Sequence, residues 1–404
     1  MVYSDYHDIQ AGKRVSHPVI ELQTGSVRDD FNFGSVLLFD SKALKAAAGA
    51  GRKQTFKYAG LYSLWLAVSR THPITRVGEH LYGKVELDVR QSDQKQFDYV
   101  DPKNRAVQVE MEAAVTEHLK RIGAWLKPKF KAPDLDAGEF AYEASVIIPV
   151  RNRVQTVGDA VASVLSQKTT FPFNLIVVDN HSTDGTTDLL RPIAQKDARL
   201  VHVIPQRQDL LIGGCWNEGV HHPACGRFAV QLDSDDIYSD VNTLQKVVAA
   251  FRRQQCAMVI GSYRMTNFKL EEIPPGIIDH KEWTPENGRN NALRINGLGA
   301  PRAFYTPVLR SIKLPNSSYG EDYAGVLAVS REYQIGRIFE PIYLCRRWEG
   351  NSDAGIDVAK QNAFNFYKDK IRTYEILARQ RLNQKAPVSK KAASRKVKGA
   401  KARR

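Results

Sequence analysis

Between residues 145 and 233 the chain alternates short apolar runs with amphipathic stretches. The runs are SVIIPV at 145–150, NLIVVDN at 174–180, LVHVI at 200–204 and RFAVQLD at 227–233. Continuous apolar runs of this length are typical of strands buried on both faces of a parallel sheet. Helical patterns separate them, and this alternation predicts an α/β, Rossmann-like domain with a mostly parallel central sheet flanked by helices.

The N-terminal third has a different texture. Residues 1–20 are polar, and we expect them to be irregular. Residues 21–126 are predicted to form a smaller α+β module. It has a strand candidate at 31–40, FNFGSVLLFD, and apolar residues at helical spacing over 58–70 and 107–126.

A linker rich in Pro, Lys and Gly is predicted at 127–140, followed by the α/β domain at 141–357. Helical spacing predicts a C-terminal amphipathic helix at 358–384 that packs on this domain. The last segment, 385–404, holds nine Lys and Arg residues and no acid, and its low complexity predicts a disordered basic tail. The net charge of +14 falls to +5 without these nine residues, so the body is only mildly basic.

Composition excludes several classes of protein. The four cysteines show no CxxC spacing, which argues against a disulfide framework or a zinc site. The first ten residues lack the basic and apolar regions of a signal peptide, and no apolar stretch reaches about 18 residues. We therefore expect a cytoplasmic protein.

Carboxylates crowd into one turn after the last of the four apolar runs. Asp233, Asp235 and Asp236 repel one another there and need a counter-charge. Oxygen ligands at this spacing suit Mg²⁺ or Mn²⁺. Parallel sheets bind ligands beyond the carboxyl ends of their strands, where Asn152 and Asp179 also lie. Taken alone, the acidic motif is more often a solvated surface loop.

Five motifs in order remove much of that ambiguity. With these motifs, the segment from about 143 to 352, half of the chain, resembles glycosyltransferase family 2 with its glycosyltransferase-A type fold. The motifs are SVIIPVRNR at 145–153, LIVVDNHSTDGT at 175–186, GGCWNEGV at 213–220, FAVQLDSDD at 228–236 and GEDYA at 320–324.

The resemblance implies roles for individual residues. It assigns contacts with the donor nucleotide to Pro149, Val150, Asn152, Asp179, Asn217 and Asp233. Asp235, with Asp233, would hold the metal that stabilises the departing nucleoside diphosphate. Asp322, beside Glu321, matches the catalytic base that deprotonates the acceptor hydroxyl. Attack from the face opposite the leaving group would invert the anomeric carbon.

The segment CRRWEGNSD at 345–353 is predicted to complete the site. Arg346 or Arg347 would neutralise the diphosphate, and Trp348 would stack on the acceptor sugar. A basic surface loop with a buried tryptophan is an equally good interpretation. Arg151 and Arg153 depart from the family pattern and leave the donor open.

Residues 58–82 and 323–343 share the strings YAG and LAVSR with a small gap between them. We interpret this as a partial duplication, with chance similarity as the alternative. Glu321 and Asp322 precede the second YAG, whereas Phe56, Lys57 and Tyr58 stand at the first. The N-terminal copy is therefore predicted to be non-catalytic.

The sequence thus predicts a metal-dependent inverting glycosyltransferase. It would move a sugar from a UDP- or GDP-sugar to a saccharide or lipid-linked glycan in polysaccharide or cell-surface glycan synthesis. A nucleotidyltransferase is one alternative. Another is a nucleic-acid- or membrane-binding protein with an inactive transferase domain, because the basic tail could bind an anionic polymer or the inner face of a membrane.

Overall fold

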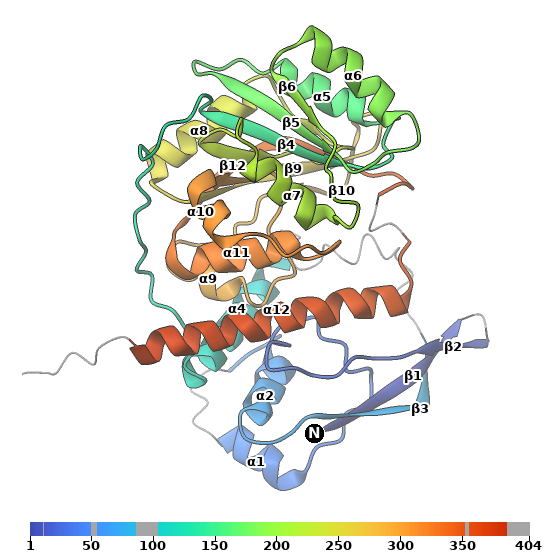
Figure 1. Ribbon diagram of the computed structural model, residues 1–404. Helices are drawn as coiled ribbons and strands as arrows, with labels where there is room; N and C mark the ends of the chain where they lie inside the picture. Colours follow the sequence, from blue (N-terminus) through green and yellow to red (C-terminus); the bar gives the residue numbers. More distant parts are fainter. Residues whose placement is uncertain (11, 50–54, 86–103, 352–354, 386–404) are drawn as a thin grey trace, which may run out of the picture.

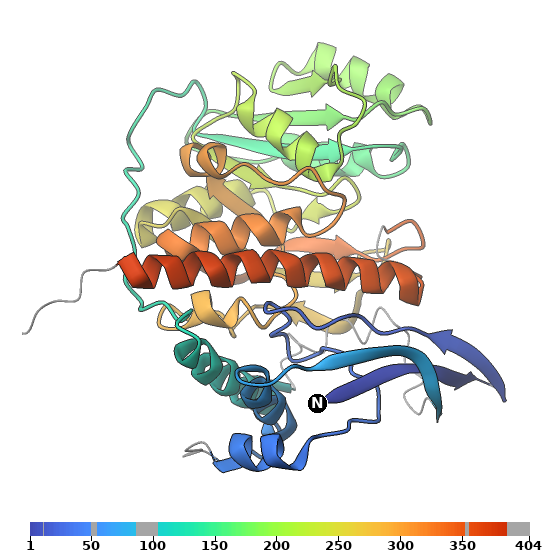
Figure 2. The ribbon, with the colours of Figure 1, turned by 60° about the horizontal axis from the view of Figure 1, so that its bottom comes forward.

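A computed structural model describes residues 1–10, 12–49, 55–85, 104–351 and 355–385. A large α/β domain and a smaller N-terminal module lie on the two sides of one long helix, α12 (Val358–Lys385) (Figure 1). The same arrangement is visible from a second direction (Figure 2). Of the predicted basic tail, only Lys385 belongs to the described residues. No helix in the described part of the chain is long and apolar enough to cross a membrane.

Four strands make the parallel half of the main sheet, in the order β6-β5-β4-β7. They are β4 (Ala144–Val150), β5 (Phe173–Asp179), β6 (Leu200–Val203) and β7 (Phe228–Gln231). Every residue of β5 is buried, as expected for a strand covered on both faces. All four correspond to the apolar runs of the sequence.

The other half of the sheet is mixed. It contains β8 (Ile237–Tyr238), β9 (Met258–Thr266), β10 (Glu272–Ile278), β11 (Arg302–Tyr305) and β12 (Ile335–Arg346). β11 runs antiparallel to both β7 and β9, whereas β12 runs parallel to β9. The predicted α/β class is confirmed, with parallel pairing concentrated in the first four strands.

Helices cover this sheet and position the loops at its carboxyl edge. The helices are α5 (Val157–Leu165), α6 (Thr186–Lys196), α7 (Ile212–His221), α8 (Thr243–Gln254), α9 (Gly288–Asn291), α10 (Thr306–Ile312) and α11 (Glu321–Glu332). α7, α10 and α11 pack against one another, and α7 also packs on β4 and β5. This packing brings the start of α11 towards the carboxyl end of β4.

The N-terminal module is an α+β unit. Its strands β1 (Val2–Gln10), β2 (Lys13–His17) and β3 (Thr75–Val85) pair in the order β2-β1-β3, beside α1 (Ser41–Gly49), α2 (Gly60–Ser69) and α4 (Arg105–Arg121).

The prediction that residues 1–20 are irregular was wrong. The polar side chains of β1 hid the strand because they are paired within the module: Asp5 with Arg76, and Asp8 with His17. The strand predicted at 31–40 was also wrong. Apart from a single bridge between Leu38 and Val2, this segment is a loop whose aromatic residues fill the core of the module.

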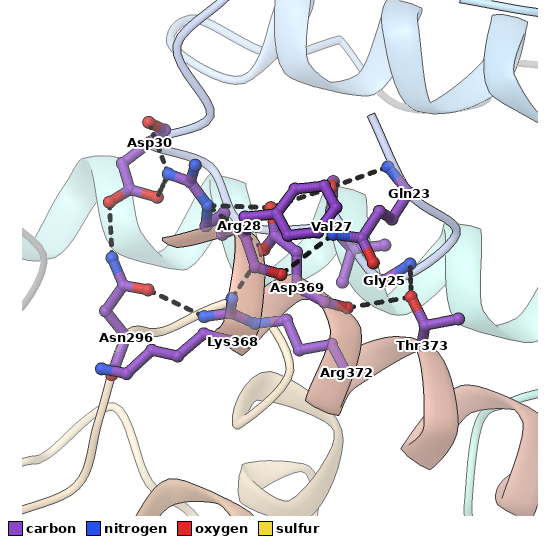
Figure 3. Close-up of polar contacts among 12 residues, drawn as sticks. Gln23, Gly25, Val27, Arg28, Asp30, Asn296, Lys368, Asp369, Arg372 and Thr373 are labelled. Atoms are coloured by element: carbon purple, nitrogen blue, oxygen red, sulfur yellow. Dashed lines mark hydrogen bonds and ion pairs between the residues drawn. The ribbon is translucent and has the colours of Figure 1, made fainter. Parts of the chain in front are cut away.

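α12 packs on both units rather than on the α/β domain alone. On the module side, Asp369 accepts hydrogen bonds from Ser26 and Arg28 (Figure 3). On the other side, Arg372 donates to the Tyr323 hydroxyl of α11 at 3.0 Å and to the Asn296 side chain at 2.8 Å. Asp369 also pairs with Arg372 at 2.8 Å, so one buried carboxylate links the module to the α/β domain.

The module repeats the pairing pattern of the mixed half of the sheet. β1 pairs antiparallel with β2 and parallel with β3, as β9 pairs with β10 and β12. Each parallel pair of strands carries two register shifts. In the module they flank the paired residues Asp5 and His80, and in the main sheet they flank the paired residues Ser262 and Pro341. A register shift is a specific local feature, and on this shared irregularity we keep the partial duplication as a proposal.

When the two similar segments are aligned on the starts of α2 and α11, no gap is needed. α2 and α11 begin 261 residues apart, and with this offset residues 58–85 and 319–346 are identical at 11 of 28 positions. Tyr62 and Tyr323 then correspond, and their hydroxyls donate to the carbonyls of Val27 and Ala292. Gly60 and Leu61, not Phe56 to Tyr58, stand where α11 has Glu321 and Asp322.

Candidate active site

A cavity of about 980 Å³ opens at the carboxyl ends of β4 and β7, between the α/β domain, the N-terminal module and α12. It gathers residues from segments far apart in the sequence. Of the predicted site residues, those that line it are Pro149, Val150, Asp233, Asp235, Glu321, Asp322 and Arg347. The predicted residues outside its lining are Asn152, Asp179, Asn217, Arg346 and Trp348.

The acidic turn after β7 forms one side of the cavity. Asp233 accepts a hydrogen bond from Gln231 at 2.8 Å. Asp235 accepts from Trp348 Nε1 at 3.2 Å and from Asn351 Nδ2 at 3.0 Å. Burial, together with the charge of Asp235, raises the pKa values of Asp233 and Asp236 above their usual range. A bound cation would relieve this repulsion.

The donor set fits a metal only in part. Within the described ranges, no three His, Cys, Asp or Glu side chains come together as a metal cluster. Asp233 and Asp235 would therefore supply a minority of the ligands. Mg²⁺ bound in this way usually keeps several waters and takes other oxygens from substrate phosphates.

A second pair of carboxylates faces the same cavity from the start of α11. The Asp322 carboxylate accepts from Arg302 at 2.9 Å, and 29% of its side chain is exposed. Burial raises the pKa of Asp322, but the charges of Arg302 and Lys368 outweigh it and hold the pKa below the ordinary value. Asp322 is therefore ionised at neutral pH and able to accept a proton.

Glu321 is the opposite case. It is buried, and its Oε2 has no hydrogen-bond partner among the described residues. Burial, and then the neighbouring charge of Asp322, raise its pKa to about 8. At neutral pH the two adjacent carboxyl groups are thus in different protonation states, which favours Asp322 as the base.

Asp179 was predicted to contact the donor nucleotide, but it does not line the cavity. It is fully buried and accepts hydrogen bonds from the backbone of Ser182 at 3.1 Å and from the side chains of Thr187 at 2.5 Å and His202 at 3.2 Å. These contacts hold the loop between β5 and α6.

The next residue, Asn180, lines the cavity instead. Its Nδ2 donates to the Leu210 carbonyl at 2.8 Å, and its buried Oδ1 has no partner in the described chain. Sequence reasoning missed Asn180, although its position directly after a strand was the available signal.

Two predicted donor contacts, Asn152 and Asn217, have structural roles. Asn152 adopts a left-handed backbone conformation, with φ 55°, and its Oδ1 accepts from the backbone of Thr183 at 2.8 Å. The Asn217 side chain both donates to and accepts from the backbone of Leu314, at 2.7 and 3.0 Å. The Asn152 amide joins two loops, and the Asn217 amide joins α7 to the segment after α10; neither residue lines the cavity.

The predicted roles of Arg346 and Trp348 also need correction. Arg346 is 3% exposed, pairs with Asp159 at 2.7 Å and donates to the Asp235 carbonyl at 2.6 Å. Trp348 is held by its hydrogen bond to Asp235 and by an edge-on contact with Phe268. Both residues contact Asp235 of the acidic turn without lining the cavity. Of Arg346 and Arg347, only Arg347 lines the cavity.

The sheet and the acidic cavity at its carboxyl edge have the α/β architecture of the glycosyltransferase-A type that the sequence resemblance implied. Residues 145–311 match the model of Glycosyl transferase family 2. This part of the chain is a family 2 glycosyltransferase domain.

The chain is 32% identical over 121 residues to the putative teichuronic acid biosynthesis glycosyltransferase TuaG of Bacillus subtilis, covering 30% of this chain and 46% of that protein. It is 22% identical over 201 residues to dodecaprenyl-phosphate galacturonate synthase of Rhizobium johnstonii, covering 48% and 57%. The chain thus spans about half the length of these curated relatives. A structure of TarS from S. aureus with UDP-GlcNAc covers 59% of this chain and 72% of its own, with 23% identity and a TM-score of 0.45.

Proposed function

We propose that this protein transfers a sugar from a UDP- or GDP-sugar to an acceptor hydroxyl, with inversion at the anomeric carbon. One observation carries the proposal: the acidic turn and the Asp322 carboxylate face a single cavity at the carboxyl edge of the sheet. Such a reaction needs both a site that stabilises a leaving diphosphate and a base for the acceptor.

The donor would lie across the carboxyl ends of β4 and β5. Pro149 and Val150 line this part of the cavity, and the unpartnered Asn180 Oδ1 is an acceptor for a ring N–H of the base. Uracil and guanine both carry such a group. Arg347 would neutralise part of the diphosphate charge.

Asp235 and Asp233 would hold Mn²⁺ or Mg²⁺, which supplies Lewis-acid stabilisation of the departing nucleoside diphosphate. Trp348 and Asn351 orient the Asp235 carboxylate through their hydrogen bonds. On the acceptor side, Asp322 takes the hydroxyl proton as the oxygen attacks. Arg302 keeps Asp322 ionised before the transfer and stays paired with it.

The acceptor is proposed to be a saccharide or lipid-linked glycan of cell-surface polymer synthesis, at the cytoplasmic face of a membrane. The names of two relatives, a teichuronic acid biosynthesis glycosyltransferase and a dodecaprenyl-phosphate galacturonate synthase, support this setting. The N-terminal copy is proposed to be non-catalytic, because Gly60 and Leu61 replace the carboxylate pair.

The test is a donor screen with Mn²⁺, in which release of nucleoside diphosphate is followed with and without EDTA. We expect release from one donor, lost on chelation and reduced at least about 100-fold in Asp235→Asn and Asp322→Asn. The matched control is Asp188→Asn, whose side chain is 79% exposed on α6.

Two other outcomes would contradict the proposal. Release of pyrophosphate from a nucleoside triphosphate and a sugar phosphate would indicate a nucleotidyltransferase. Folded protein that binds no nucleotide sugar, but binds anionic vesicles or polymers, would indicate a binding protein with an inactive domain.

A further inference from the structure

Lys368 lies on the face of α12 that borders the cavity. It is 6% exposed, yet it belongs to the lining of the cavity. Figure 3 places its side chain beside Asn296 and Arg372. Asp30 and Asn32 of the N-terminal module and Asp322 of α11 line the same cavity, so Lys368 belongs to the wall that α12 and the module form.

This lysine has no carboxylate in direct contact among the described residues. No carboxylate of the described residues forms an ion pair with its Nζ, which donates to the Asn296 carbonyl at 2.5 Å and lies 4.3 Å from the centre of the Tyr319 ring. Its cationic neighbours differ: Arg28 and Arg372 pair with Asp369, and Arg302 pairs with Asp322. An ammonium has three donors, and burying a charge without a partner is costly.

The charges around Lys368 leave room for a bound anion. Burial, and then the nearby Arg372, lower its pKa to about 8, while Asp322, Glu321 and Asp30 oppose this shift. These carboxylates are close enough to act on the ammonium, but none reaches it directly. An anion bound at Nζ would complete the pairing that the protein leaves open.

Amide side chains line the same cavity as Lys368. Asn32 from the N-terminal module, and Gln361 and Asn365 from α12, line the same wall. Amides both donate and accept hydrogen bonds, so they suit a ligand rich in hydroxyl groups. The wall therefore combines one cation with several groups suited to polyols.

We propose that α12 and the N-terminal module form the acceptor subsite, in which Lys368 binds a phosphate or carboxylate of a polyhydroxylated acceptor. This inference rests on the proposed function and adds the chemical class of the acceptor. The anionic group would lie on the Asp322 side of the cavity, near the hydroxyl that attacks the donor.

The first experiment compares acceptors in pairs with the donor found above: glycerol 3-phosphate with glycerol, glucuronate with glucose, and a polyprenyl phosphate with its alcohol in detergent. We expect the anionic member of at least one pair to stimulate nucleoside diphosphate release more strongly. The pair that responds distinguishes a lipid phosphate from a water-soluble phosphate or carboxylate.

Lys368→Met should raise the KM for the anionic acceptor about tenfold or more, and by more than the KM for the donor. Lys368→Gln, which retains a donor for the Asn296 carbonyl, should show the same change if the charge is what matters. Lys370→Met is the matched control, because Lys370 is exposed on the same helix. Equal KM values for the wild type and both Lys368 variants would overturn the proposal, as would a preference for the neutral acceptors.

A binding measurement separates this proposal from the proposed function. Inorganic phosphate is titrated calorimetrically into protein held in EDTA without donor. Phosphate binding that needs Lys368 but not Lys370 would support the anion site even if no donor were turned over. Equal phosphate binding by the wild type and both Lys368 variants would overturn the anion site even if transfer activity were found.

Discussion

At the residue scale, two pairs of adjacent residues divide their roles: one member bonds to neighbours inside the protein, and the other lines the cavity. Asp179 and Arg346 are buried and bonded to neighbours inside the protein, whereas Asn180 and Arg347 line the cavity. A motif in the sequence places both members of each pair at the same strand end. It cannot say which one is used internally, because those partners come from distant segments.

Asn180→Ala is therefore expected to weaken donor binding. The loss of one hydrogen bond to the base should raise the donor KM or the nucleotide Kd about five- to tenfold, which corresponds to roughly 1 kcal/mol. Calorimetric titration with the nucleotide diphosphate checks this value. Asn152→Ala serves as the comparison, because its amide joins two loops outside the cavity. An unchanged Kd in Asn180→Ala would remove this residue from the donor site.

Glu321 gives a prediction for stability. Its pKa is raised from 4.5 to about 8, so the folded state favours the neutral carboxyl. The stability that Glu321 contributes is full below pH 4.5 and is lost as the pH rises towards 8. Glu321→Gln should therefore gain stability relative to the wild type between pH 5 and pH 9, by at least about 1.4 kcal/mol, the value of one pKa unit.

Urea unfolding of metal-free protein at these two pH values measures the difference. Glu117→Gln is the control, since its side chain is 55% exposed and should show no such trend. An equal effect of Glu321→Gln at both pH values would show that Glu321 is already ionised when folded.

At the element scale, the sequence predicted best where burial is continuous. The runs that form β4, β5, β6 and β7 were found because a strand covered on both faces must be apolar throughout. β1 was missed because its Asp5 and Asp8 are paired across the module, which no local pattern reveals. Asp233 and Asp235 were predictable because they follow a strand, and Glu321 and Asp322 were assigned through the family resemblance. Arg302 and Lys368 reach the cavity only through tertiary packing.

Gly25 tests how closely the N-terminal module fits α12. A Cβ on Gly25 would lie 2.2 Å from the backbone nitrogen of Thr373, so even alanine must push the helix away. Gly25→Ala is expected to lower the thermal midpoint by several degrees and to weaken acceptor binding. Gly49→Ala is the control, because a Cβ there meets no atom within 4 Å. Matching thermal midpoints for the two variants would mean that the contact can adjust.

At the scale of the whole molecule, the cavity is completed by parts outside the family 2 segment. Residues 145–311 supply the acidic turn and the proposed nucleotide end, but α12 and the N-terminal module supply another wall. If the module arose by duplication of the mixed half of the sheet, it kept the packing of that half and lost the carboxylates of α11. It then contributes to the site by shape and hydrogen bonding, which explains why no catalytic motif marks it in the sequence.

The link between the two halves can be tested through Asp369, which is fully buried and pairs with Arg28 on one side and Arg372 on the other. Asp369→Asn removes the carboxylate that pairs with the buried Arg372, whereas Arg28 keeps its ion pair with Asp30 at 2.7 Å. Breaking a buried pair of this kind typically costs about 3–5 kcal/mol.

We expect this loss to appear as an earlier and broader urea transition, because the module and the α/β domain no longer unfold together. Tryptophan fluorescence is one probe, and far-ultraviolet circular dichroism is the other. In Asp188→Asn the two probes should give coincident transitions, as in the wild type. If they also coincide in Asp369→Asn at an unchanged midpoint, the two halves are held together by their apolar contacts, and the ion pairs of α12 only set its orientation over the cavity.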